Sequence, residues 1–448
     1  MRVRRLRRRR SDPRHLAPTD TAARRPRIEP RRPRAALAAA VLLVVTSVAA
    51  VVLPAVPASA DAIRDREYWL NDYGILSAWS TTKGEGVTIA VIDTGIDGGH
   101  PDLAGAVSGG TDFSGQGAAN GQQPVGDPDD SSHGTMVASL LAGRGNGSAG
   151  IIGVAPEADL LSISIGVGDP GADSDQQIAD AVLWAVDHGA DVINMSLTRN
   201  TPDWPSSWDD AFLYAMENDV VVVAAAGNRG SGTKAVGAPA TMPGVLTVAG
   251  VDRAGTASVD ASSQGITIGV AAPSEELVGA VPGGGYVIWN GTSGATPLVA
   301  GVVALVRAAH PELDAANVIN RLTATAAPAG ASGVDPIYGF GLLRADRAVR
   351  SNVEKTTENP MGDLADWVRV YRRADATPAP IATVTPEPVE SGGDAPPAEE
   401  EPVASVIPSA FALRYVGIPL LLFVGFGGAA VLLIFAARRH LGAARRKE

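Results

Sequence analysis

The sequence predicts an α/β domain with a doubly wound, mostly parallel sheet over residues 86–350, and one transmembrane helix near the C-terminus. Three observations predict the domain. Short apolar runs alternate with segments of helical periodicity, some runs lack polar residues at alternate positions, and no fixed-period repeat is visible. Strands that helices cover on both faces are apolar throughout, and alternation of strands with helices favours a parallel sheet.

The expected strands are short and rich in β-branched or small apolar residues, at 87–92, 160–165, 192–195, 220–225 and 245–251. Between them, residues 174–188 and 206–218 place apolar side chains at the spacing of one helical stripe. A further apolar stretch, 298–306, predicts a buried helix.

Charge is distributed very unevenly along the chain. Residues 1–34 carry a net charge of +11 and residues 438–448 carry +4, so residues 61–437 must carry −26 to give the total of −11. Nucleic-acid binding needs basic surface that displaces phosphate counterions. The acidic body of the chain therefore argues against a nucleic-acid partner, and the basic ends need another explanation.

The first 60 residues are predicted to be a signal peptide for export. An Arg-rich start precedes a nearly uninterrupted apolar run at 35–53, and Ala58-Ser59-Ala60 follows it. Small residues at both ends of that tripeptide are typical of a cleavage site, so we expect cleavage after Ala60. The apolar run is also long enough to remain as an uncleaved anchor, and that alternative stays open. Residues 61–85 form an N-terminal extension.

A second apolar run, 415–437, has no charged residue and is long enough for one tilted membrane helix. We assign 411–437 to the lipid bilayer. The basic tail 438–448 follows it, so the positive-inside rule puts the tail in the cytoplasm and the domain outside the cell. Residues 351–410 are predicted to be a Pro/Ala/Glu-rich linker. Whether 355–373 docks as a short helix stays open.

No cofactor is indicated. The chain has no cysteine, which excludes disulfides, thiol catalysis and cysteine-ligated metals. Residues 145–150 fit the G-x-G-x-x-G pattern, but they follow an expected helix and precede an apolar strand-like run. That order is the reverse of the one a dinucleotide site requires, so we interpret the motif as a glycine loop. No ligand loop indicates a metal site.

Ser293 lies in Gly291-Thr292-Ser293-Gly294, just before the apolar stretch 298–306. A helix start has free backbone N–H groups and a dipole that favours negative charge, so the N–H of Ser293 could stabilise an oxyanion. A serine hydroxyl becomes a good nucleophile when a neighbouring base takes its proton. Considered alone, the segment is better explained as a helix cap by Thr292 or Ser293.

Among six histidines, His133 is the best candidate for that base because it opens an apolar helical segment. The others lie in the terminal segments, at expected helix C-termini or, for His100, in a loop. Asp93 ends the first expected strand, where open α/β sheets collect catalytic groups. A carboxylate there could fix the imidazole tautomer, and a structural cap of the next turn is an equal alternative.

Asn228 follows Gly227 at the end of the strand 220–225. Its amide could complete an oxyanion hole, an interaction typically worth about 3–4 kcal/mol in the transition state. A turn role is the alternative for this pair. The combination of Asp93, His133 and Ser293 in this chain order, with Asn228, favours a serine hydrolase over four unrelated structural roles.

Four segments resemble the signature segments of the subtilisin-like serine proteases, namely Asp93-Thr94-Gly95, His133-Gly134-Thr135, Ala226-Gly227-Asn228 and Gly291-Thr292-Ser293. The resemblance covers roughly 85–350 and implies a subtilisin-like fold and a serine-type endopeptidase with a polypeptide substrate. It implies Asp93, His133 and Ser293 as the catalytic triad and Asn228 as an oxyanion donor.

The same resemblance implies that two segments line the S1 pocket, Ser196-Leu197-Thr198 and Ala225-Ala226-Gly227. It also implies that the strand near 162–166 pairs with extended substrate by β-addition. Ser132 and Thr198 stand where many family members have glycine. These two departures leave the turn before His133 and the S1 specificity open.

The wider layout is similar to that of the mycosins, membrane-anchored proteases associated with type VII secretion in actinobacteria. The shared features are the signal peptide, the segment Glu67-Tyr68-Trp69-Leu70, the Pro-rich linker and the C-terminal helix. The similarity implies processing of exported proteins and a type VII secretion membrane complex as partner. The alternative function is a scaffold of that complex in which proteolysis is dispensable.

Overall fold

The computed structural model describes residues 60–127, 130–147, 149–167 and 173–372. The predicted signal peptide up to residue 59, the transmembrane helix at 411–437 and the basic tail lie outside the described residues. Residues 373–410 of the predicted linker lie outside them as well.

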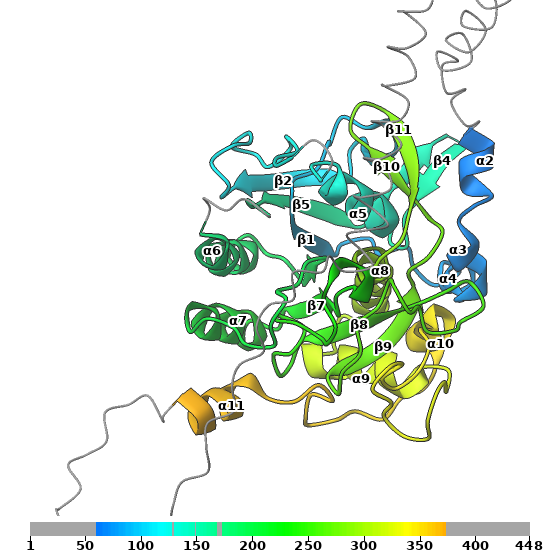
Figure 1. Cartoon of the computed structure of the whole chain (residues 1–448). Helices are drawn as coiled ribbons and strands as arrows, with labels where there is room; N and C mark the ends of the chain where they lie inside the picture. Colours follow the sequence, from blue (N-terminus) through cyan, green and yellow to red (C-terminus); the bar gives the residue numbers. More distant parts are fainter. Residues whose placement is uncertain (1–59, 128–129, 148, 168–172, 373–448) are drawn as a thin grey trace, which may run out of the picture. The chain divides into compact units, whose positions relative to one another are not determined.

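A seven-stranded sheet lies at the centre of the domain, in the order β2-β5-β1-β6-β7-β8-β9, and every neighbouring pair is parallel. The sheet extends from β1 to one edge through β5 and β2, and to the other edge through β6 to β9 (Figure 1). The predicted doubly wound, parallel fold is confirmed. The strands are β1 (Thr88–Asp93), β2 (Val107–Asp112), β5 (Asp159–Ser164), β6 (Val192–Met195), β7 (Val221–Ala225), β8 (Leu246–Val251) and β9 (Ile268–Pro273).

Helices cover both faces of this sheet. Helices α6 (Ser174–Asp187) and α7 (Ser207–Glu217) pack side by side on one face, and α5 (His133–Ala142) and α8 (Thr292–Ala309) pack together on the other (Figure 1). All five residues of β7 are buried, which explains its uninterrupted run of Val and Ala.

Helix α8 is the one described helix that is long and apolar enough to cross a membrane, and 78% of its apolar window is buried inside the domain. It contacts β6, β7, β8 and β9. Its apolar sequence is therefore explained by burial against the sheet, and α8 is a core helix.

Smaller elements surround the sheet. Two antiparallel hairpins are β3 (Arg144–Asn146) with β4 (Ala149–Ile152), and β10 (Leu277–Val281) with β11 (Gly285–Trp289). The G-x-G-x-x-G motif lies in the first hairpin, so it does not connect a strand to a helix. The remaining helical elements are α2 (Ala60–Arg64), α3 (Tyr68–Asp72), α4 (Ile75–Ala78), η1 (Pro101–Leu103), η2 (Arg229–Ser231), α9 (Ala315–Thr325), α10 (Ala345–Arg350) and α11 (Leu364–Tyr371).

The chain on both sides of the expected catalytic domain packs onto it. The N-terminal segment, residues 60–79, contributes Trp69 to the core with no exposed surface. At the other end, the ring of Trp367 in α11 packs at a tilt against the ring of Trp204, with 4.4 Å between the ring centroids. The segment 355–373 that the sequence left open therefore contains a docked helix.

Candidate active site

Asp93 and His133 form a hydrogen-bonded pair at the C-terminal end of β1. Asp93 is the last residue of β1 and is 2% exposed, and His133 is the first residue of α5. His133 Nδ1 lies 2.8 Å from Oδ1 and 3.0 Å from Oδ2 of Asp93. The backbone N–H of Thr94 also donates to Oδ1, at 2.7 Å, so the buried carboxylate is well satisfied. This arrangement keeps the proton on Nδ1 and leaves Nε2 as the acceptor.

Thr94 and Gly134 hold the start of α5 against the end of β1. The hydroxyl of Thr94 accepts a hydrogen bond from the N–H of Gly134 at 2.9 Å and donates to the carbonyl oxygen of Ser131 at 3.1 Å. A Cβ atom added to Gly134 would lie 2.3 Å from the carbonyl oxygen of Gly95. The glycine after His133 is therefore required for close approach of the two segments.

The pKa of the His133 imidazole is raised above its ordinary value. Burial alone lowers that pKa, but the negative charge of Asp93 and its hydrogen bond together outweigh burial, with a smaller contribution from Asp130. The raised pKa means that Asp93 stabilises the imidazolium. That is the state that forms when His133 takes a proton.

Ser293, the second residue of α8, is bonded to Ser196 rather than to His133. Its hydroxyl donates to the carbonyl oxygen of Ser196 at 3.1 Å, and the hydroxyl of Ser196 donates back to the carbonyl oxygen of Ser293 at 2.8 Å. Within the described part of the chain, no hydrogen bond joins Ser293 to His133. A hydroxyl can rotate between acceptors, and catalytic hydrogen bonds often tighten only when substrate binds.

Trp289 is a neighbour of His133 that sequence reasoning missed. It ends β11, and its ring meets the imidazole edge to face, with 5.7 Å between ring centroids. An aromatic residue four positions before Ser293 was the only sequence signal, and the pairing of β11 with β10 that brings it to His133 is a tertiary feature.

Asn228 is tied to the residues before Ser293. Its Oδ1 accepts hydrogen bonds from the backbone N–H of Thr292 at 2.8 Å and from the Thr292 hydroxyl at 2.9 Å. The amide nitrogen then faces away from Thr292, and it lies 3.2 Å from where a Cβ of Gly291 would be. Gly291 has a φ of +148°, which favours glycine. The structure therefore brings Asn228 to the start of α8 with an amide donor available.

The two segments expected to line S1 meet the start of α8. Ser196 contacts Ser293 as described, and the N–H of Gly227 donates to the Thr292 hydroxyl at 3.2 Å. Thr198 donates its hydroxyl to the carbonyl oxygen of Arg199 at 3.0 Å. A Cβ atom added to Gly237 would lie 2.6 Å from the Thr198 hydroxyl oxygen, so the branched side chain of Thr198 faces Gly237.

The expectation that the strand at 162–166 pairs with substrate is wrong for 162–164. These residues belong to β5, which pairs with β1 on one edge and β2 on the other. Both rows of backbone groups are already used, so no edge remains for an added strand. The sequence pattern showed a strand but not its place inside the sheet.

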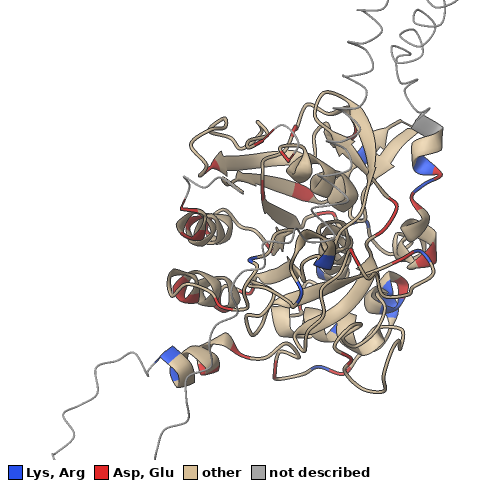
Figure 2. Cartoon of the chain, viewed as in Figure 1, with Lys and Arg blue, Asp and Glu red and all other residues tan. Residues whose placement is uncertain are grey.

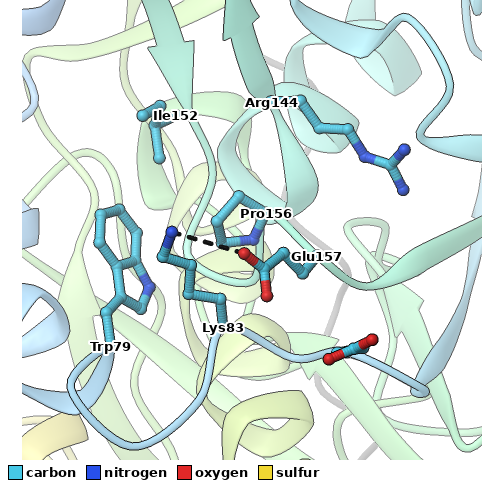
Figure 3. Close-up of a pocket in the computed structure, with 7 residues that line it drawn as sticks. Trp79, Lys83, Arg144, Ile152, Pro156 and Glu157 are labelled. Carbon is cyan, nitrogen blue, oxygen red and sulfur yellow. Dashed lines mark ion pairs between the residues drawn. The ribbon is translucent and has the colours of Figure 1, made fainter.

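Neither of two cavities is lined by Asp93 or His133, and they differ in their relation to the predicted S1 segments. The cavity in Figure 3, of about 650 Å³, contains neither residue, and Lys83 and Glu157 form an ion pair of 3.4 Å across it. A cavity of about 520 Å³ borders Leu197 and Thr198. The second one is the cavity that adjoins the predicted S1 segments. The wall of the cavity in Figure 3 consists of Trp79, Lys83, Glu85, Arg144, Ile152, Pro156 and Glu157.

The family model of the subtilases matches residues 84–341, which is more than half of the chain. The chain belongs to the subtilase family. As a subtilase it is a serine protease, and subtilisin from Bacillus pumilus is 39% identical to it over 269 residues, which cover 60% of this chain and 92% of that protein.

Solved subtilases similar to this chain include mycosins. MycP1 from Mycobacterium smegmatis is 32% identical with a TM-score of 0.55, over 66% of this chain and 86% of that one. MycP3 protease from the type VII (ESX-3) secretion system is 33% identical with a TM-score of 0.54, over 64% and 88%. The expected similarity to mycosins is confirmed.

Proposed function

We propose that this subtilase is a membrane-anchored, extracytoplasmic endopeptidase that processes exported proteins with Asp93, His133 and Ser293 as its triad. The observation that carries the proposal is the Asp93–His133 pair at the end of β1, with its bidentate contact and raised imidazole pKa. The proposed role of Ser293 as the nucleophile is supported by its position at the start of the core helix α8.

The chemistry follows from these positions. His133 Nε2 takes the proton of the Ser293 hydroxyl as Oγ attacks the scissile carbonyl carbon, and Asp93 stabilises the imidazolium. The negative charge that develops on the carbonyl oxygen is stabilised by the backbone N–H of Ser293 and the amide of Asn228. The imidazolium then gives its proton to the leaving amine. In the second half of the reaction His133 takes a proton from water, the water attacks the acyl-enzyme, and the imidazolium returns the proton to Ser293 Oγ.

The cellular setting is inferred from the ends of the chain and from the relatives. We propose residues 1–60 as the signal peptide, 411–437 as the membrane anchor and 438–448 as a cytoplasmic tail. MycP3 comes from a type VII secretion system, and this supports a secretion complex of that kind as the partner of this subtilase. Figure 2 shows acidic residues on the outer helices α6 and α7, which supports the absence of a nucleic-acid partner.

The test compares exported proteins from cells that carry full-length wild-type protein or Ser293→Ala. N-terminal peptide mapping is expected to show cleaved products in the wild type and intact precursors in the variant. Ser206→Ala is a matched control, because Ser206 precedes α7 and its side chain caps nothing. Equal cleavage in both strains contradicts the proposal. Normal secretion with Ser293→Ala, together with its loss when 411–437 are removed, instead favours the scaffold.

A further inference from the structure

Tyr68 connects the N-terminal segment to a turn near the nucleophile. It is the first residue of α3 and is 7% exposed, and its hydroxyl donates to the carbonyl oxygen of Glu275 at 2.8 Å. The guanidinium of Arg253 lies 4.9 Å from the centroid of its ring. Burial raises the pKa of the Tyr68 phenol, so the hydroxyl stays protonated and remains a donor.

The peptide group that joins Glu275 to Glu276 is bonded on both sides. Its carbonyl oxygen accepts from Tyr68, and its N–H donates to the side-chain oxygen of Asn290 at 2.7 Å. Rotation of this one peptide group therefore breaks both hydrogen bonds. Since Asn290 lies three residues before Ser293, the group links the N-terminal segment to the chain that enters α8.

Two features show that this turn is constrained. Glu276 has a φ of +54°, a conformation that residues with a Cβ seldom adopt unless surrounding contacts hold them there. The carbonyl oxygen of Ser274 accepts a hydrogen bond from the N–H of Gly291 at 2.8 Å. The turn thus holds both Asn290 and Gly291, and Gly291 itself has a φ of +148°.

We propose that Tyr68 is a positioning residue for catalysis, which fixes the 275–276 peptide group and through Asn290 sets the placement of Ser293. This inference rests on the proposed role of Ser293 as nucleophile. Ser293 Oγ now donates to Ser196, and it must align with His133 Nε2 and with the substrate carbonyl to react. A small shift of the chain before α8 changes that alignment while the fold and the Asp93–His133 pair stay intact.

The test measures inactivation of the full-length protein by a fluorophosphonate probe, separated into the maximal rate constant and the half-saturating concentration. Tyr68→Phe removes one hydroxyl and keeps the buried ring. We expect its maximal rate constant to fall about 10- to 100-fold, since misplacement of reacting groups has effects of that size. The half-saturating concentration and the pH dependence set by His133 are expected to stay unchanged.

Tyr214→Phe is the matched control. Tyr214 is on α7, across the sheet from α8, and its hydroxyl donates to Asp187 at 2.9 Å. This control also loses one tyrosine hydrogen bond, and we expect a wild-type rate constant from it.

Asn290→Ala removes the other hydrogen bond of the same peptide group, the one donated by the N–H of Glu276, and does not change the N-terminal segment. If Tyr68 acts through Asn290, the double variant is expected to be no slower than the slower single variant, because both remove one linkage. Asn290→Ala also keeps the proposal testable where Tyr68→Phe folds poorly. A wild-type maximal rate constant for Asn290→Ala overturns the proposal in that case.

Two results overturn the role of Tyr68. They are a wild-type maximal rate constant for Tyr68→Phe, and full additivity of the two rate effects in the double variant. Failure of the proposed triad looks different, because probe labelling then persists in Ser293→Ala whatever happens at Tyr68.

Discussion

At the scale of single residues, the Asp93–His133 pair shows how a site is encoded at the ends of elements. The sequence placed both residues correctly at a strand end and a helix start, because apolar periodicity marks where elements begin and end. It could not show that the Ser293 hydroxyl donates to Ser196 or that Trp289 meets the imidazole. Those contacts depend on side-chain rotamers and on the packing of a hairpin far along the chain.

The raised pKa of His133 predicts the acid limb of the pH–activity profile. The imidazole must be neutral to accept the serine proton, so activity is expected to rise with pH around a midpoint above the ordinary histidine value of about 6.5. Asp93→Asn is expected to lower that midpoint and to reduce kcat by about 10⁴-fold. The check is kcat/KM for a peptide substrate across pH.

Asp130→Asn is the control for that profile. Asp130 contributes less to the raised pKa and makes no described bond to the imidazole. It is expected to lower the midpoint slightly while kcat stays near wild type. An unchanged midpoint in Asp93→Asn would show that Asp93 does not set the pKa of His133.

Glu67 predicts a pH dependence of folding stability. Burial raises the pKa of its carboxyl group to about 9, against the backbone N–H of Ile152 and the charge of Arg64. The folded state therefore holds a proton that the unfolded chain releases above about 4.5. This contribution to stability is complete below that pH, declines as pH rises, and is lost once pH passes the folded value.

We expect Glu67→Gln, which cannot ionise, to flatten the decline in Tm between pH 5 and pH 9 relative to wild type. Thermal melts at three or more pH values provide the check. Glu157→Gln is the matched control, because that glutamate is exposed and its one ion pair among the described residues is with Lys83, across a surface cavity. Parallel Tm curves for wild type and Glu67→Gln would contradict the prediction.

At the scale of elements, the sheet strands were predicted where short runs are rich in β-branched or large apolar residues, and two were missed where glycine or proline interrupts the run. All five expected strands lie in the sheet, but β2 contains Gly109 and Gly110, and β9 ends at Pro273. Glycine and proline are depleted in strands, so neither segment carried a local signal. Tertiary pairing with β5 and β8 determines them instead.

Helix α11 is a second element that tertiary contacts determine and that the local sequence did not predict. It is short, and its position is stabilised by Trp367 on Trp204 and by Arg372, which pairs with Asp209 at 2.7 Å. A helix of this length has little intrinsic stability in water, so periodicity alone left it undecided. Tertiary contacts explain why it forms.

Trp367→Ala is expected to release α11 without affecting catalysis. Loss of the aromatic contact should cost about 0.5–1.5 kcal/mol locally. Hydrogen exchange of residues 364–371 should speed up while α8 stays protected. Val370→Ala serves as control, because Val370 is on the same helix and is 56% exposed. Unchanged exchange in Trp367→Ala would mean that other contacts hold the helix.

At the scale of the whole molecule, composition and charge suggest a protein with a catalytic domain on one side of a membrane and a short basic tail on the other. The domain and its family are supported by the sheet and by the match over 84–341. The proposed ends depend on hydropathy and charge alone, because they lie outside the described residues. Cysteine labelling can test them directly, since the chain has no cysteine of its own.

Single cysteines introduced as Thr377→Cys and Gly442→Cys are expected to behave oppositely. A membrane-impermeant maleimide added to intact cells should label the first, and it should label the second only after permeabilisation. Labelling of the second in intact cells would reverse the proposed orientation. The wild-type protein, which has no cysteine, is the control and should not be labelled.

The central claim is that Ser293 is a nucleophile activated by His133. The most direct measurement is mass-spectrometric mapping of a fluorophosphonate adduct on the full-length protein and on His133→Ala, with folding verified by thermal melting. The account predicts one adduct on the peptide that contains Ser293, and its near-complete loss in His133→Ala. An adduct on another residue, or equal labelling of Ser293 in both proteins, would contradict it.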